Sequence, residues 1–186
     1  MRIAIVRSKF RPDGGAEKQT NFYIDACLNL GHDVTLICQK WGNISPLCNV
    51  RILNTPCKKP FYQEISDVVG HEKFDHVIGL EPAPRTTILR LGDGIHEDWL
   101  QLKNADNPLK YLFQRYLSKK HRCKINYQHE CLSNPFLKKV IVNSNFIKNS
   151  ILMRYPELQD KVHLIRNISN NGSQTSVESP TPFRFV

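Results

Sequence analysis

The sequence lacks the signals of a membrane-spanning or exported protein. None of its 186 residues belongs to an apolar run that approaches the ~20 residues of a transmembrane helix. The opening, MRIAIVRSKF, has a short apolar stretch with charges on both sides, which is not the pattern of a secretory signal. We therefore expect a cytoplasmic protein, whose contact with a membrane would be peripheral and on the inner face of the plasma membrane.

Paired cysteine motifs are also missing. The six cysteines include no C-x-x-C pair, which predicts reduced thiols. The segment HRCKINYQHEC gathers two histidines and two cysteines, but its spacing lacks the paired half-sites of structural zinc. Residues two apart on a helix face different ways, so helix packing explains this segment better than a metal site, and we expect no metal. The residues concerned are His121, Cys123, His129 and Cys131.

Two nucleotide-binding patterns are absent, and acidic residues are scarce. Neither the G-x-G-x-x-G fingerprint nor the Walker pattern occurs, which argues against an ordinary dinucleotide site and a P-loop.

Lys and Arg number 26 against 17 Asp and Glu, which gives a net charge of +9. Such a surface favours nucleic acid, phosphorylated ligands or an anionic membrane. No nucleic-acid-binding motif accompanies the charge, so nucleic acid is the least favoured of these partners.

Much of the positive charge lies in one run between residues 110 and 124. A run of this kind is most often the solvated face of a helix. The alternative is a contact with an anionic membrane or with a phosphorylated acceptor. The run comprises Lys110, Arg115, Lys119, Lys120, Arg122 and Lys124.

Short apolar, β-branched runs alternate with stretches of helical spacing, which predicts an α/β fold. We expect a Rossmann-like open parallel sheet with helices on both faces. A helix after the first strand ends at Gly31, one or two helices span 107–132, and another at 145–155 is capped by Ser144 or Asn145. The predicted strands are 2–6, 33–39, 50–54, 74–81, 86–94, 138–144 and 161–167. The domain is expected to cover 1–166, and the polar segment 167–186 to be a disordered tail.

Two glycine-rich stretches directly follow predicted strands, so both point to the carboxyl edge of the sheet, where ligands bind in such folds. Gly14 and Gly15, in PDGGAEK, precede a helix whose N-terminus could receive a phosphate; the alternative is a plain loop glycine. Asp93, in RLGDGIHE, could act as a base or accept a hydrogen bond from a sugar, although taken alone the segment favours a common Asp-Gly turn. Arg90 could pair with Asp93 or with an anionic ligand.

The order of these segments resembles the N-terminal domain of the retaining glycosyltransferases of family 4, which have the two-domain GT-B architecture. The motifs that carry the resemblance are PDGGAEK, LGHDVTLIC, RLGDG, VIVNSNFIKNSI and VHLIRN, and they cover residues 1–167. The nearest likeness is to the bacterial lipopolysaccharide-core hexosyltransferases. The resemblance implies a nucleotide sugar as donor and a glycan or glycolipid as acceptor, with no cofactor and no metal.

The resemblance also implies roles for individual residues. Gly14 and Gly15 would face the donor diphosphate, and Asp93, as the catalytic residue, would lie near the transferred sugar or the acceptor hydroxyl. Lys18 would face the cleft from the first helix. The remaining residues expected to line the cleft or hold the acceptor are Arg90, Gly92, Gly94, His96 and Ser144.

The sequence departs from this family where the second, donor-binding domain would begin. That domain would supply the positive charge for the leaving diphosphate, whereas here VHLIRN leads into a polar tail. We therefore expect little or no transferase activity from the 186-residue chain alone, as a truncated product or as one half of a split enzyme. The alternative is a non-catalytic binding or regulatory module that pairs with a separate donor-domain chain.

Overall fold

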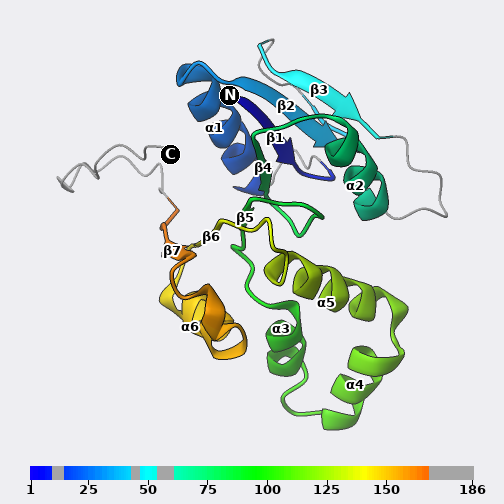
Figure 1. Cartoon of the computed structure of the whole chain (residues 1–186). Coiled ribbons are helices and arrows are strands. Elements are labelled where there is room, and N and C mark those ends of the chain that lie inside the picture. Colours follow the sequence, from blue (N-terminus) through cyan, green and yellow to red (C-terminus); the bar gives the residue numbers. More distant parts are fainter. Residues whose placement is uncertain (10–14, 43–46, 54–60, 168–186) are drawn as a thin grey trace.

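The computed structural model describes residues 1–9, 15–42, 47–53 and 61–167. Within them, a parallel seven-stranded sheet has the order β3-β2-β1-β4-β5-β6-β7 (Figure 1). The fold class and the place of every predicted strand are confirmed; β1 has the predicted bounds, and the other strands are shorter than the sequence indicated. The strands are β1 (Arg2–Val6), β2 (Asp33–Cys38), β3 (Asn49–Ile52), β4 (His76–Gly79), β5 (Ile88–Arg90), β6 (Lys139–Val142) and β7 (Val162–Leu164).

The helices follow the prediction less closely. The region 107–132 holds two α-helices joined by a π-helical turn, and α1 stops just before Gly31, which has the positive φ (+75°) expected of a C-terminal glycine. The sequence analysis missed α2 and α3. The helices are α1 (Gly15–Asn29), α2 (Phe61–His71), α3 (His96–Lys103), α4 (Pro108–Leu112), η1 (Phe113–Leu117, π), α5 (Lys119–Leu132), α6 (Asn145–Arg154) and η2 (Pro156–Leu158, 3₁₀).

Helices cover both faces of the sheet, as predicted. On one face, Ile24 and Cys27 of α1 pack against the side chains of Ile3, Ile5 and other strand residues. Alternate strand residues point to the opposite face. There, one cluster joins α2 to β1 and β4, and a second joins α5 and α6 to β5 and β6. These buried clusters fix the carboxyl edge of the sheet, where the candidate site lies.

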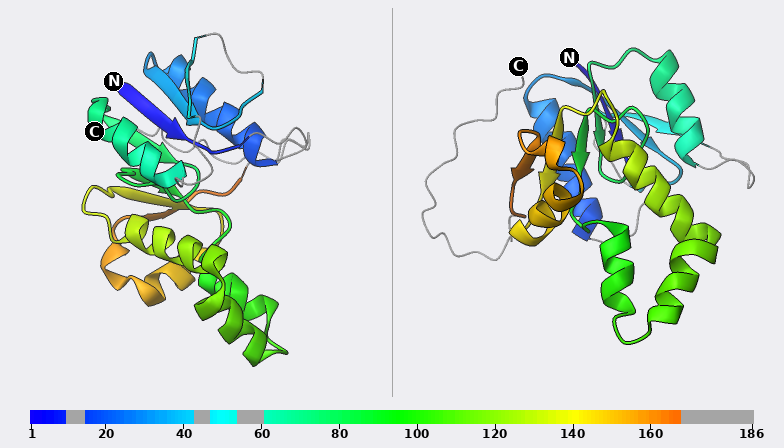
Figure 2. Two further views of the ribbon diagram at one scale, coloured as in Figure 1. Left: turned by 90° about the vertical axis from the view of Figure 1, so that its right-hand side faces the viewer. Right: turned by 60° about the horizontal axis from the view of Figure 1, so that its bottom comes forward.

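The chain between β5 and β6 forms a helical extension, which we define as α3, α4, η1 and α5. Figures 1 and 2 show it projecting away from the sheet, beyond the end of β5. No helix in the described part of the chain has both the length and the apolar character needed to cross a membrane. The predicted boundary at residues 166/167 stays a prediction, because residues 168–186 lie outside those described.

Candidate active site

The first glycine-rich stretch lies at the start of α1. Gly14 is outside the described residues, so its predicted phosphate contact stays a prediction. Gly15 is the first residue of α1, and a Cβ atom built on it would meet nothing within 4 Å. Packing of the described residues therefore does not require a glycine there. Lys18 is exposed on the first turn of the same helix.

Asp93 lies in the turn between β5 and α3, flanked by two glycines in different environments. Gly94 has a φ of +75°, which an L side chain rarely adopts. At Gly92, a Cβ atom would lie 2.9 Å from Nη1 of Arg90, closer than ordinary contact allows. Asp93 itself is exposed and makes no hydrogen bond or ion pair to the rest of the described chain, so its carboxylate can accept one from a ligand.

Arg90 ends β5 and turns toward α1 rather than toward Asp93. Its Nη2 donates to Oε1 of Gln19 at 2.6 Å and to Oδ1 of Asn167 at 2.9 Å. It also lies near Tyr23, where it partly offsets the rise that burial causes in the pKa of the phenol. The possible pairing with Asp93 is therefore wrong. None of the described carboxylates forms an ion pair with Arg90, so its guanidinium brings an unpaired positive charge to the edge of the sheet.

His96 packs into an aromatic stack at the base of the extension. Its Nε2 lies 2.9 Å from Nδ1 of His121, and its ring stacks on the rings of His121 and Trp99. Burial, reinforced by Lys124 and His121, lowers the pKa of His96 to about 4, so the ring is neutral at pH 7. The structure thus gives His96 a packing partner on α5, and its predicted cleft-lining role is untested.

Ser144 caps α6, which is one of the two roles that the sequence allowed for this position. Its Oγ accepts a hydrogen bond from the backbone N–H of Ile147 at 3.3 Å. A capping serine satisfies one of the first free N–H groups of a helix. Its proposed contact with a ligand remains a prediction.

A half-buried carboxylate at the same edge was not predicted from the sequence. Glu81 follows β4, and it accepts hydrogen bonds from the backbone N–H of Ser8 at 2.7 Å and from the Ser8 hydroxyl at 3.0 Å. Burial raises the pKa of the Glu81 carboxyl, against the lowering effects of Ser8 and Arg7. This pair ties the segment after β1 to the segment after β4, at the point where the strand order reverses. An acid directly after an apolar strand was the available signal.

Three of the four residues of the rejected zinc set have separate partners. His121 meets His96, His129 meets the hydroxyl of Tyr155 at 2.9 Å, and the Cys131 thiol donates to the backbone oxygen of Ala83 at 3.0 Å. Burial raises the pKa of Cys131 to about 12, so it stays a thiol. Across the described ranges, no group of three or more candidate ligands is placed to hold a metal ion.

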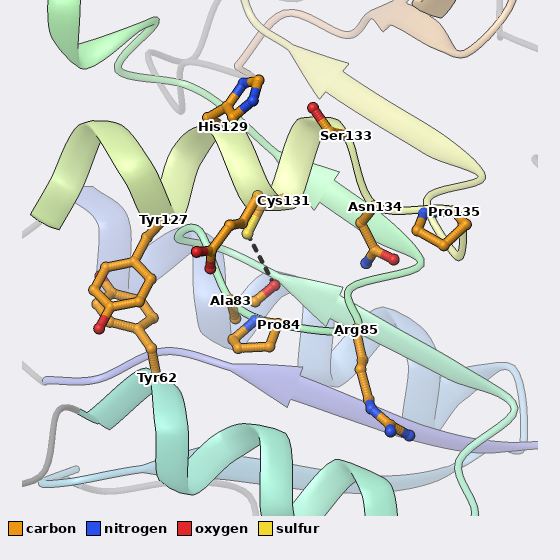
Figure 3. A pocket seen from close by; sticks show the side chains of 11 residues that line it. Tyr62, Ala83, Pro84, Arg85, Tyr127, His129, Cys131, Ser133, Asn134 and Pro135 are labelled. Atoms are coloured by element: carbon orange, nitrogen blue, oxygen red, sulfur yellow. Dashed lines mark hydrogen bonds between the residues drawn. The ribbon is translucent and has the colours of Figure 1, made fainter.

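The Cys131–Ala83 hydrogen bond borders a cavity of about 400 Å³ between α2, α5 and the segment before β5 (Figure 3). Tyr62 and Tyr127 face each other at one end, with ring centroids 4.3 Å apart. Arg85 and Asn134 stand at the other. The cavity contains none of the site residues predicted from the sequence, so it is separate from the turn that carries Asp93.

Comparison with solved structures identifies the architecture. WaaG, a glycosyltransferase involved in lipopolysaccharide biosynthesis, superposes on 87% of this chain and 44% of its own, with a TM-score of 0.74 and 14% identity. The fold is that of one half of a GT-B glycosyltransferase. Apo UGT2 of Phytolacca americana matches with a TM-score of 0.52 and 11% identity, over 92% of this chain and 53% of its own. UGT2 complexed with UDP-2-fluoro-glucose and pterostilbene matches with a TM-score of 0.50 and 8% identity, over 93% and 54%.

The chain thus spans about half the length of the GT-B structures it matches, as an N-terminal half would. No protein-family model matches the sequence, and a search of curated proteins finds no match. The resemblance to GT-B enzymes is confirmed at the level of fold.

Proposed function

We propose that this chain is the acceptor-side domain of a retaining glycosyltransferase, which transfers a hexose from a nucleotide sugar to a glycan or glycolipid such as lipopolysaccharide core. One observation carries the proposal. In a glycosyltransferase fold, the start of α1, the guanidinium of Arg90 and the exposed carboxylate of Asp93 all lie at the carboxyl edge of the sheet. Ligands of open α/β sheets bind at this edge.

The charges suit the two partners of such a reaction. The first N–H groups of α1 have no partner within the helix and lie at the positive end of the helix dipole, and Arg90 adds a charge that no described carboxylate pairs with. Gly14, Gly15 and Lys18 would therefore face the donor diphosphate or the cleft beside it. Asp93 would accept a hydrogen bond from a sugar hydroxyl, with its carboxylate held close to the reacting atoms.

The rest of the donor site would come from a second domain. The GT-B structures that this chain matches are about twice as long. Transfer needs positive charge where the diphosphate leaves and closure of two domains around the donor. We therefore propose that the 186-residue chain turns over nucleotide sugars slowly or not at all by itself. Within the described residues, no observation favours the alternative of a non-catalytic regulatory module.

The helical extension would place the domain on an anionic membrane. The extension has exposed apolar side chains, and exposure reaches 78% at Leu109 and 68% at Leu117. The residues of the basic run are exposed as well, except Arg115, which is ion-paired with Glu97. A helix of this kind binds an anionic bilayer by burying its apolar side chains while lysines meet the lipid phosphates. The exposed apolar residues of α4 and η1 are Leu109, Leu112, Phe113, Tyr116 and Leu117.

Ligand binding at Asp93 tests the proposed function. UDP-glucose and a phosphorylated core glycolipid would be titrated into the ¹⁵N-labelled chain, with Asp93→Asn compared to Asp106→Asn, an exposed aspartate on the extension. We expect shifted amides around Gly15 and Asp93, and acceptor binding about tenfold weaker in Asp93→Asn alone, because a hydrogen bond to a charged group is lost. Equal affinities for the two variants would contradict the assignment of Asp93.

Vesicle binding tests the membrane contact separately. Sedimentation with vesicles containing anionic lipid should retain the chain at low salt and release it as the salt concentration rises. Phe113→Ser and Leu117→Ser should each weaken retention, whereas Leu30→Ser, an equally exposed residue at the end of α1, should not. Equal retention on vesicles of neutral lipid would refute an electrostatic contact.

A further inference from the structure

Helix α3 begins without a cap from its own neighbouring residues. Its N-cap position is Ile95, which has no side-chain oxygen and makes no capping hydrogen bond. The first N–H groups of a helix have no partner within the helix, and a serine, threonine or aspartate usually supplies one. The helix that follows the Asp93 turn therefore needs a partner from elsewhere in the fold.

Gln128 of α5 supplies that partner from 32 residues away along the chain. Its Oε1 accepts a hydrogen bond from the backbone N–H of His96 at 2.7 Å, and its Nε2 donates to the backbone oxygen of Gly94 at 2.9 Å. The side chain is only 6% exposed. One buried amide thus holds the backbone on both sides of Ile95, directly after Asp93.

Two further side chains lie against the same turn. His121, seven residues before Gln128 and so on the same face of α5, holds the ring of His96. On the other side of Asp93, the backbone at Gly92 passes close to the guanidinium of Arg90, which is bound to α1. The exposed carboxylate is therefore carried by a turn that α5 holds at one end, with the Arg90 guanidinium beside the other end.

We propose that Gln128 is a positioning residue for Asp93. By bridging Gly94 and His96, the amide sets the start of α3 and limits the directions in which the Asp93 carboxylate can point. The chemical role of Asp93 rests on the proposed function, but the positioning does not. Two hydrogen bonds to one backbone segment distinguish this arrangement from a buried glutamine that is merely satisfied, because removing the amide would leave both backbone groups without a partner.

Amide NMR on the full 186-residue chain, at 21.5 kDa, tests the proposal without any assay of activity. In the unaltered protein we expect slow exchange of the His96 N–H and an order parameter near ~0.85 at Asp93. Gln128→Leu keeps the bulk but removes both hydrogen bonds. It should speed exchange at His96 at least about fivefold and lower the order parameter of Asp93 toward ~0.6. Gln101→Leu, the same change at an exposed position of α3, should alter neither value.

Gln128→Glu separates positioning from packing and replaces Gln128→Leu if that variant does not fold. An ionised glutamate accepts from His96 but cannot donate to Gly94, whereas a protonated one does both, and burial raises its pKa. Asp93 should thus be mobile in this variant at pH 8 and ordered near pH 5, relative to the unaltered chain at each pH. Unchanged exchange at His96 and unchanged order at Asp93 in folded Gln128→Leu would overturn the proposal, as would unchanged order at Asp93 in Gln128→Glu at pH 8. If Asp93→Asn binds acceptor normally, the proposed function fails while this result stands.

Discussion

Replacing Gly79 with alanine should lower the free energy of unfolding, because a Cβ atom at this position would collide with its neighbours. Gly79 ends β4, and a Cβ atom there would lie 2.9 Å from the backbone oxygen of Glu81 and 3.0 Å from two side-chain atoms of Thr86. Thr86 is fully buried, and its hydroxyl donates to the backbone oxygen of Ala83 at 2.6 Å. Neither neighbour is the free end of a flexible chain, so the backbone after β4 must move.

The cost can be built from these contacts. Overpacking of a buried site costs ~1–3 kcal/mol, and displacing Thr86 would weaken a hydrogen bond of ~1 kcal/mol. Alanine also lowers the conformational entropy of the unfolded chain, which stabilises the folded protein by ~0.5–1 kcal/mol. We expect a net loss of about 2 kcal/mol from a total stability of the order of 5–15 kcal/mol.

Urea unfolding followed by circular dichroism measures this loss. With an m-value of ~2 kcal/mol/M, the midpoint of Gly79→Ala should fall by ~1 M at an unchanged m-value. Gly15→Ala is the matched control, because its Cβ atom would meet nothing within 4 Å, and its midpoint should stay level or rise. A midpoint for Gly79→Ala within ~0.2 M of the unaltered protein would refute the steric reasoning.

Two further predictions concern the turn around Asp93. Gly92→Ala should push the Arg90 guanidinium away from Gln19, seen as a shift of the Arg90 side-chain NMR signals with a modest loss of ~1 kcal/mol in urea unfolding, and unchanged signals would contradict the 2.9 Å contact. The pKa of His96, about 4 in the folded protein against ~6.5 when unfolded, means that the unfolded chain binds the proton first as the pH falls. The stability that the neutral His96 ring contributes should be complete above pH ~6.5 and lost as the pH falls from there to ~4. In His96→Phe, the free energy of unfolding should therefore depend less on pH within that window.

The sequence predicted the elements whose signals are local. RIAIV and KVIV are short β-branched runs, and they form the buried strands β1 and β6. Ser144 caps α6 through its own side chain, which sequence spacing can indicate. The order of strands and glycine-rich stretches was then enough to place Asp93 at the edge of the sheet.

The missed features depend on contacts between distant segments. Helix α3 has no cap in its own sequence, and the residue that supplies one lies on α5. The link between Ser8 and Glu81 joins residues 73 positions apart, so no window along the chain reveals it. The sequence suggested Asp93 or an anionic ligand as the partner of Arg90, whereas in the fold its guanidinium donates to Gln19. In each case, tertiary packing decided between chemically reasonable local options.

The hydrogen bond from His96 to Gln128 also implies an order in which the helices α3 and α5 fold during synthesis. During synthesis, α3 leaves the ribosome well before residue 128 does, so its first N–H has no protein partner until α5 is complete. An eight-residue helix without a cap is too short to persist in water. The turn that carries Asp93 would therefore gain its final geometry only when α5 folds back onto it, after the strands β1, β2 and β4 have already left the ribosome.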